Sequence, residues 1–218
     1  MKKIVIFVAL FIVPIVAYLF FALATHNSLF LSTITKNINE LPKGTTLNGR
    51  DIRLQDKITI LGFPGSDMLK DKGNLLNLNQ KIYNKYKGFT DFQLVMLTPD
   101  GSQEQARLLL DELSRYADVS DWNFVFTTPE EIAQFHKSLH VSKELDENSG
   151  STYVFIIDKE RNLRGRTGKD QKGKEEYFEG YNTISAAEMH NEMSDDVRIL
   201  LREYRLALQR NNKDKRKI

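Results

Sequence analysis

An uninterrupted apolar segment near the amino terminus most strongly constrains how this chain can fold. After Lys2 and Lys3, the run Ile4–Ala24 carries no charge and is almost wholly apolar. Its length of about 21 residues matches the roughly 20 that a helix needs to cross a bilayer, and Pro14 is tolerated in such helices. We therefore expect residues 1–25 to form a single transmembrane anchor.

A cleaved signal peptide is the alternative for this segment. Residues 22–24, Ala-Leu-Ala, have the small-x-small form of a cleavage site, but the apolar run exceeds the roughly 7–15 residues of a typical signal peptide. The two preceding lysines place the amino terminus in the cytoplasm under the positive-inside rule. We therefore expect a single-pass protein of the bacterial inner membrane, with its carboxy-terminal domain in the periplasm.

Composition excludes several classes of function. The 31 basic and 29 acidic residues nearly cancel, and part of the basic excess lies at the two ends of the chain, so no basic face for nucleic acid is expected. The sequence contains no cysteine, which excludes disulfides, thiolate nucleophiles and cysteine-based metal sites. The remaining length suffices for one globular α/β domain.

The chain beyond the anchor divides into three parts. Residues 26–45 are polar and rich in Asn, Thr and Ser, which is typical of a membrane-proximal linker. Residues 46–210 are predicted to form the globular domain. Residues 211–218 form a basic tail that we expect to be frayed.

Within the domain, strand and helix patterns alternate. Apolar, partly β-branched runs predict strands at Ile58–Phe63, Phe92–Leu97 and Asn123–Thr127. Helical spacing predicts helices at 68–87, 102–116, 128–139 and 184–209. Residues 153–158 and 163–166 read as a hairpin, and the charge-rich stretch 170–179 reads as a solvated loop. This order predicts an α/β fold with a mainly parallel sheet and one antiparallel hairpin.

Several of these segments together resemble the Sco/SenC family, over roughly Leu47 to Tyr204. The residues that carry the resemblance are Leu61-Gly62-Phe63, Thr98-Pro99-Asp100, Asp121-Trp122-Asn123-Phe124, Thr128-Pro129-Glu130-Glu131 and the hairpin Phe155–Gly165. The resemblance implies a thioredoxin-like (Sco-type) domain. Sco proteins are membrane-anchored copper-binding factors that help to metallate cytochrome c oxidase, so the family's anchor agrees with the apolar run.

The copper ligands of that family are absent. The family motif Cys-Pro-x-x-Cys-Pro should follow Phe63, where Ser66 and Lys70 stand at the two cysteine positions. The family histidine should precede the hairpin, where residues 148–151 read Asn-Ser-Gly-Ser. A hydroxyl and an ammonium group cannot replace thiolates for Cu(I), which prefers soft sulfur ligands. The resemblance therefore implies a degenerate member without the Cys/Cys/His ligands, and we expect no cofactor.

Non-cysteine chemistry remains open as an alternative. His136 and His140, spaced i,i+4, would share a helix face and could hold a metal with a third ligand. Met68, Met189 and Met193 could offer thioethers to Cu(I), although such methionines more often fill cores. Ser66 and Lys70 could also form a nucleophile pair at a helix amino terminus.

These observations predict a protein that binds rather than catalyses. We expect a membrane-anchored, redox-inactive accessory or assembly factor of a respiratory haem-copper (cytochrome c) oxidase, and not an enzyme. A tethered binding domain unrelated to respiration is the remaining possibility. The expected interaction surface is the former metal loop, formed by Phe63, Pro64, Gly65, Ser66, Asp67, Met68 and Lys70.

Overall fold

The computed structural model of the chain describes residues 10–16, 30–116, 118–120, 122–169, 173 and 175–215, with side chains as far as residue 207. Most of the predicted anchor at residues 1–25 lies outside these ranges. Among the described residues, no helix combines the length and the apolar character that a membrane span requires.

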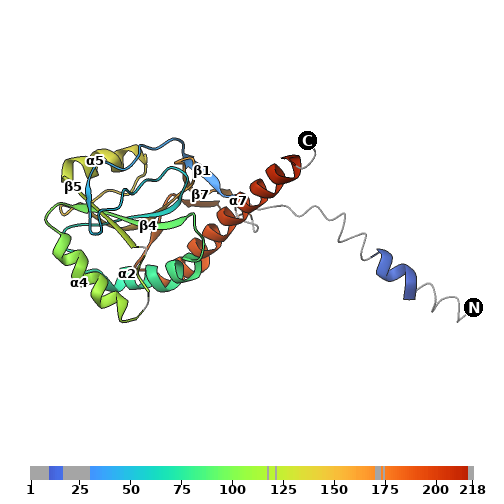
Figure 1. The fold of residues 1–218 in the computed structure, drawn as a ribbon. Helices are drawn as coiled ribbons and strands as arrows, with labels where there is room; N and C mark the ends of the chain where they lie inside the picture. Colours follow the sequence, from blue (N-terminus) through green and yellow to red (C-terminus); the bar gives the residue numbers. More distant parts are fainter. Residues whose placement is uncertain are drawn as a thin grey trace, which may run out of the picture.

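A mixed β-sheet forms the centre of the domain (Figure 1). Its main path has the order β1-β7-β6-β3-β4-β5-β2, while β8 pairs with β7 and β9 with β6. The central strands β3, β4 and β5 are parallel, and the remaining pairs are antiparallel. The strands are β1 (Ser32–Thr35), β2 (Thr45–Thr46), β3 (Ile58–Pro64), β4 (Phe92–Pro99), β5 (Trp122–Thr127), β6 (Gly150–Ile157), β7 (Leu163–Lys169), β8 (Glu175–Phe178) and β9 (Tyr181–Asn182). The predicted parallel core and the hairpin are confirmed.

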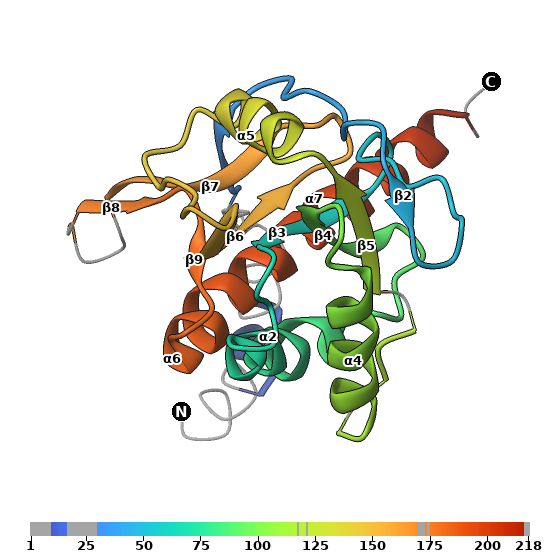
Figure 2. The same ribbon diagram turned by 90° about the vertical axis from the view of Figure 1, so that its left-hand side faces the viewer.

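Helices cover both faces of the sheet (Figure 2). α5 (Pro129–Ser138) lies on one face, and α4 (Gln103–Ser114) lies on the other with two longer composite helices. The first composite helix joins α2 (Lys72–Leu78), the π-helical turn η1 (Asn79–Tyr83) and α3 (Asn84–Tyr86). The second joins α6 (Ala186–Glu188), the π-helical turn η2 (Met189–Met193) and α7 (Ser194–Lys215).

The alternation of side chains along each strand divides the core into two clusters. In β3, Ile58 and Ile60 belong to the cluster beneath α2, α4 and α7. Leu61 and Phe63, on the other face of β3, belong to the cluster beneath α5. Side chains alternate in this way along any extended strand, and both faces of β3 are buried. At the carboxyl end of β3, the Phe63 side chain therefore points to the side of the sheet that α5 covers.

The prediction of a linker at residues 26–45 is wrong over most of that stretch. Ser32–Thr35 forms β1 and pairs with β7, and Leu31 and Ile38 are buried. The polar composition of this stretch conceals the strand because an edge strand needs only a few buried side chains and obtains its backbone hydrogen bonds from its neighbour. Residues 31–45 therefore belong to the folded domain.

Two further expectations are corrected near the carboxy terminus. The charge-rich stretch 170–179, predicted as a loop, contains β8, whose backbone pairs with β7 from Arg166 to Lys169. The last helix extends to Lys215 rather than ending near residue 209. The predicted frayed tail at 211–218 is therefore helical as far as the structure describes it.

Candidate functional site

The predicted interaction surface at residues 63–70 follows β3 at the carboxyl end of the central sheet. Phe63 is only 1% exposed, and its ring packs against His136, at 5.2 Å between centroids, and Phe155, at 6.1 Å. Met68 is fully buried in the opposite core cluster. Gly65 is also buried. The prediction that these three residues belong to a surface is therefore wrong, because their positions are fixed by packing.

The surface of this loop is formed by the other four residues. Pro64 and Ser66 are half-buried, and Asp67 and Lys70 are exposed. Residues 68–71 form a turn, and α2 begins only at Lys72. The helical turn that was expected to bring Ser66 and Lys70 together as a nucleophile pair is therefore not formed.

Gly65 allows the loop to turn back against a second segment of the chain. Its φ of 71° lies in the left-handed region, and a Cβ atom there would lie 2.9 Å from the carbonyl oxygen of Asn148. The next residue, Ser66, donates its backbone N–H to that same oxygen at 3.1 Å. Only glycine adopts this conformation at little cost and also leaves room for the approach of the second segment.

The second segment is a tight turn organised by Asp146. One carboxylate oxygen of Asp146 accepts the backbone N–H groups of Asn148 and Gly150, at 2.8 and 2.7 Å. Ser149 has a left-handed backbone with φ of 60°. These bonds hold the turn, so the carbonyl and side chain of Asn148 point to the loop after β3.

The structure thus brings together the two places where the Sco resemblance implied ligands. The Ser66 hydroxyl lies 3.5 Å from the amide oxygen of Asn148, and Lys70 lies in the exposed turn that follows. The hydroxyl and the amide oxygen are hard donors, and an ammonium group has no lone pair to donate. Cu(I) needs soft sulfur or imidazole donors. The residues at this site therefore do not fit copper.

The two histidines proposed as alternative metal ligands do not share a helix face. His136 lies near the end of α5 and is 9% exposed, whereas His140 lies beyond the helix with a left-handed φ of 52°. Met68, Met189 and Met193 are fully buried core residues. Throughout the described ranges, no group of three or more His, Cys, Asp or Glu side chains could hold a metal ion.

His136 is nevertheless an unusual core residue. Its Nε2 atom is buried without a hydrogen-bond partner, and its ring packs edge-on against Phe63 and Phe155. Burial lowers the pKa of His136, and this effect outweighs the opposing influence of Glu144 and Glu179. The imidazole therefore supports the end of β3 in its neutral form.

A small cleft beside the loop was not anticipated from the sequence. It has a volume of about 50 Å³ and is lined by Pro64, Asp71, Asn74, Asp146 and Thr183, among others. A space of this size holds only one or a few water molecules. No spacing pattern could have revealed it, because its walls come from four distant segments.

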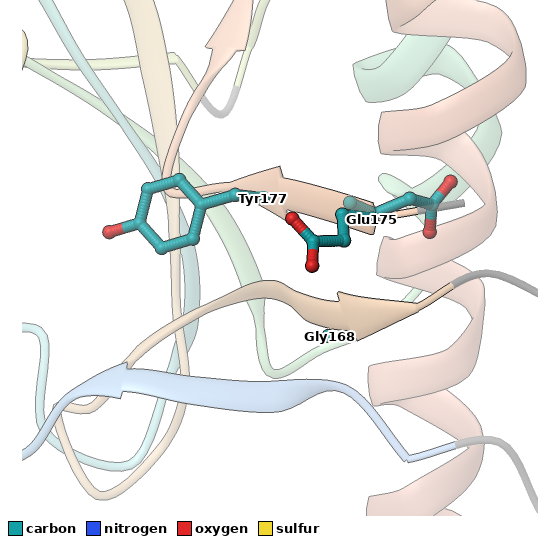
Figure 3. Close-up of a pocket in the computed structure, with 4 residues that line it drawn as sticks. Gly168, Glu175 and Tyr177 are labelled. Atoms are coloured by element: carbon teal, nitrogen blue, oxygen red, sulfur yellow. The ribbon is translucent and has the colours of Figure 1, made fainter. Parts of the chain in front are cut away.

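A larger, open hollow lies on the arm formed by β7 and β8. It measures about 350 Å³ and is lined by Gly168, Glu175, Glu176 and Tyr177 (Figure 3). Tyr177 is 61% exposed and donates its hydroxyl to Glu179 at 3.0 Å. Because the hollow is open and none of its described lining residues is buried, it does not compete with the loop as a candidate site.

No protein-family model matches the chain. No curated protein matches it either. Solved structures similar to it include Sco family proteins and thioredoxin-like thiol-disulfide oxidoreductases, in agreement with the resemblance seen in the sequence.

Three of these structures illustrate the range of similarity. A putative electron transfer protein from Aquifex aeolicus has 15% identity and a TM-score of 0.50, covering 75% of this chain and 98% of its own. ScoI of Arabidopsis thaliana, crystallised with copper, has 16% identity and a TM-score of 0.47, covering 73% and 97%. The thioredoxin domain of a Bacteroides vulgatus thiol-disulfide oxidoreductase has 17% identity and a TM-score of 0.43, covering 63% and 91%. The chain has a mixed α/β, thioredoxin-like fold, as predicted.

Proposed function

We propose that this chain is a membrane-anchored, redox-inactive, Sco-like protein that acts by binding a protein partner. The partner we propose is a respiratory haem-copper oxidase or one of its assembly factors. The protein would accordingly be an accessory factor of that oxidase rather than an enzyme or a copper carrier.

One observation carries this proposal: the loop after β3 is held in a defined geometry although it carries none of the copper ligands that the resemblance implied. Gly65 makes the left-handed turn, and the Ser66 N–H is bonded to Asn148 across 82 positions of sequence. Thiol chemistry requires cysteine, and the sequence has none. A precisely held loop with no reactive group is suited to presenting a surface, since a rigid loop loses little conformational entropy on binding.

The candidate contact residues are the exposed Asp67 and Lys70 and the half-buried Ser66. The buried residues Phe63 and Met68 hold the loop from beneath, so substitutions there would test folding rather than binding. For the same reason a bulky group at Gly65 is a poor probe, because it would collide with the turn at Asn148. Charge changes at Asp67 and Lys70 leave the packing intact.

Crosslinking gives the most direct test, because a chain without cysteine accepts a single labelled cysteine. Asp67→Cys carrying a photocrosslinker should capture an oxidase subunit or assembly factor in intact membranes. Arg53→Cys is the matched control, since the Arg53 side chain is 70% exposed and its backbone carbonyl accepts from Gln93 at the start of β4, at the end of the sheet opposite the loop. The control should capture no oxidase component.

The cellular test uses the gene deletion. We expect a lower amount of assembled oxidase that added copper does not restore, and the double charge reversal Asp67→Lys/Lys70→Glu should reproduce this loss with the domain still folded. Normal oxidase levels in the deletion strain, together with no oxidase subunit crosslinked through position 67, would instead favour a tethered binding domain unrelated to respiration.

The proposed topology has its own test. Protease added to spheroplasts should degrade the domain, because the anchor would hold it on the outer side of the inner membrane. Full protection of the domain, or a soluble mature protein that begins at Thr25, would refute the anchoring.

A further inference from the structure

The outer face of α7 is basic. Val197 and Leu200 of this helix are buried in the core, whereas Arg198, Arg202 and Arg205 are exposed. Their spacing of i, i+4 and i+7 places the three arginines on one side of the helix. Arg198 is paired with Asp195 at 2.8 Å, and the Arg205 guanidinium lies 5.9 Å from the ring centre of Phe89.

The helix continues past the domain with the same charge. Figure 1 shows the carboxy-terminal part of α7 projecting beyond the sheet. After residue 207, the helical part of the sequence adds Arg210, Lys213 and Lys215 against a single acid, Asp214. The projecting end therefore has a net positive charge, although the chain as a whole is nearly neutral.

The chain from the predicted anchor enters the domain beside this helix. The backbone N–H of Leu31 donates to Glu203 of α7 at 2.6 Å, and the Leu31 carbonyl accepts from Arg164. Phe30, immediately before it, is 70% exposed. Residues 26–30 can extend at most about 18 Å, at roughly 3.6 Å per residue. Leu31 and the adjacent part of α7 must therefore lie within that distance of the end of the anchor.

The former metal loop lies at the opposite end of the sheet. Leu201, Tyr204 and Arg205 of α7 lie around Ile58, at the start of β3. The loop begins after Pro64, where β3 ends. A strand of seven residues spans about 20 Å, so the loop is separated from the basic end of α7 by the height of the sheet.

Building on the proposed anchoring, we infer that the exposed face of α7, from Arg202 to its carboxy-terminal end, docks on anionic phospholipid headgroups. The surface of a membrane that contains anionic lipid attracts basic side chains held close to it. The short tether keeps the helix within reach, and the exposed Phe30 supplies an apolar ring that can insert at the boundary between headgroups and acyl chains. Docking would hold the domain with the loop at Ser66 and Asp67 facing away from the bilayer.

The test uses the full-length protein in nanodiscs of phosphatidylcholine, with or without phosphatidylglycerol. Ala207→Cys, on the exposed part of α7, carries an environment-sensitive fluorophore. We expect its emission to shift to the blue only in discs that contain phosphatidylglycerol, and the shift to disappear in high salt because surface charges are screened. The same label at Asp67→Cys should show no dependence on lipid.

Charge removal supplies the matched comparison. Each basic residue near an anionic surface contributes about a fivefold factor, so Arg202→Gln/Arg205→Gln should weaken docking about 25-fold. Arg107→Gln/Arg115→Gln on α4 removes the same charge elsewhere on the surface and should leave the emission shift unchanged. Equal emission from position 207 in both lipid compositions would overturn the inference.

The readouts separate this inference from the proposal on which it rests. Protein that stays in the disc but shows no lipid-dependent emission overturns the docking of α7 alone. Protein that does not co-purify with the disc overturns both the anchoring and the docking, since the short reach of residues 26–30 depends on the anchor. Oxidase levels in the deletion strain test the choice of partner independently of either result.

Discussion

Removing Arg164 should destabilise the domain strongly, because this buried side chain joins three separate segments. Its guanidinium pairs with Asp158 at 3.0 Å and with Glu203 at 2.8 Å, and it donates to the carbonyl of Leu31. Arg164 is about 10% exposed, Asp158 is 1% exposed and Glu203 is 14% exposed at their side chains. Loss of one partner from a buried ion pair typically costs about 3–5 kcal/mol.

The remaining hydrogen bonds place the cost of Arg164→Met near the lower end of that range. Asp158 would still accept the backbone N–H groups of Glu160 and Asn162 and the side-chain amide of Asn162. Of its partners among the described residues, Glu203 would retain the N–H of Leu31. We therefore expect a loss of about 3 kcal/mol in the free energy of unfolding, most of it arising from the isolated Glu203 carboxylate.

Urea unfolding followed by tryptophan fluorescence measures this directly. Trp122 is the only tryptophan and is buried beside Phe124, so its emission reports on the core of the domain. With an m-value of about 2 kcal/mol/M, the midpoint should fall by about 1.5 M. The exposed Arg198→Met, on the same helix as Glu203, should change the stability by less than about 0.5 kcal/mol.

A double substitution tests whether the unpaired Glu203 carboxylate causes the loss in the free energy of unfolding. Adding Glu203→Gln to Arg164→Met removes the unpaired buried charge and should restore about 1–2 kcal/mol. If the single variant lost less than about 1 kcal/mol, or if Glu203→Gln restored nothing, the assignment of this network as a buried, coupled ion pair would be refuted.

Three other predictions concern the loop and its support. Gly65→Ala should lower stability by at least about 1–2 kcal/mol, because its left-handed backbone and the nearby Asn148 disfavour a Cβ atom, whereas Ser66→Ala should be nearly neutral in the same unfolding assay. Burial lowers the pKa of His136 in the folded state, so the unfolded state binds more protons below about pH 6.5. The free energy of unfolding should therefore fall as the pH drops. His136→Phe should flatten this dependence in unfolding titrations from pH 7.5 to 5. Copper competition titrations should detect no stoichiometric Cu(I) site in the native chain and only weak binding by Ser66→Cys/Lys70→Cys, whereas adding Asn148→His should create a tight site. Tight binding by the native chain would contradict the interpretation of this loop.

Local sequence patterns correctly predicted the strands and helices that carry a clear signal in their own residues, such as an apolar run or a helix cap. The runs at Ile58–Phe63 and Phe92–Leu97 are short, mostly apolar on both faces and bounded by turn residues, which favours buried central strands. Thr128 and Pro129 mark the start of α5, and the Thr128 side chain accepts the N–H of Glu131 as a cap. The family resemblance also located both halves of the loop site.

The short and polar strands could not be predicted in this way. β1 and β8 contain mostly hydroxyl or charged residues and are stable because each pairs with β7. Sequence also assigned His136 and His140 to one helical face, but α5 ends at Ser138. In these cases the strand pairing with β7 or the end of α5 depends on the rest of the fold, and the local sequence pattern does not encode it.

The sequence by itself determined that the chain has no thiol chemistry, that an apolar segment precedes the domain, and that an α/β core follows. Only the tertiary structure decided which residues of the loop are exposed, because Phe63 and Met68 are drawn into opposite faces of the core. It also decided that Ser66 meets Asn148 and that Leu31 joins α7 through Glu203. These contacts join residues far apart in the chain, and no local periodicity encodes a contact that forms only when the sheet and its helices pack together.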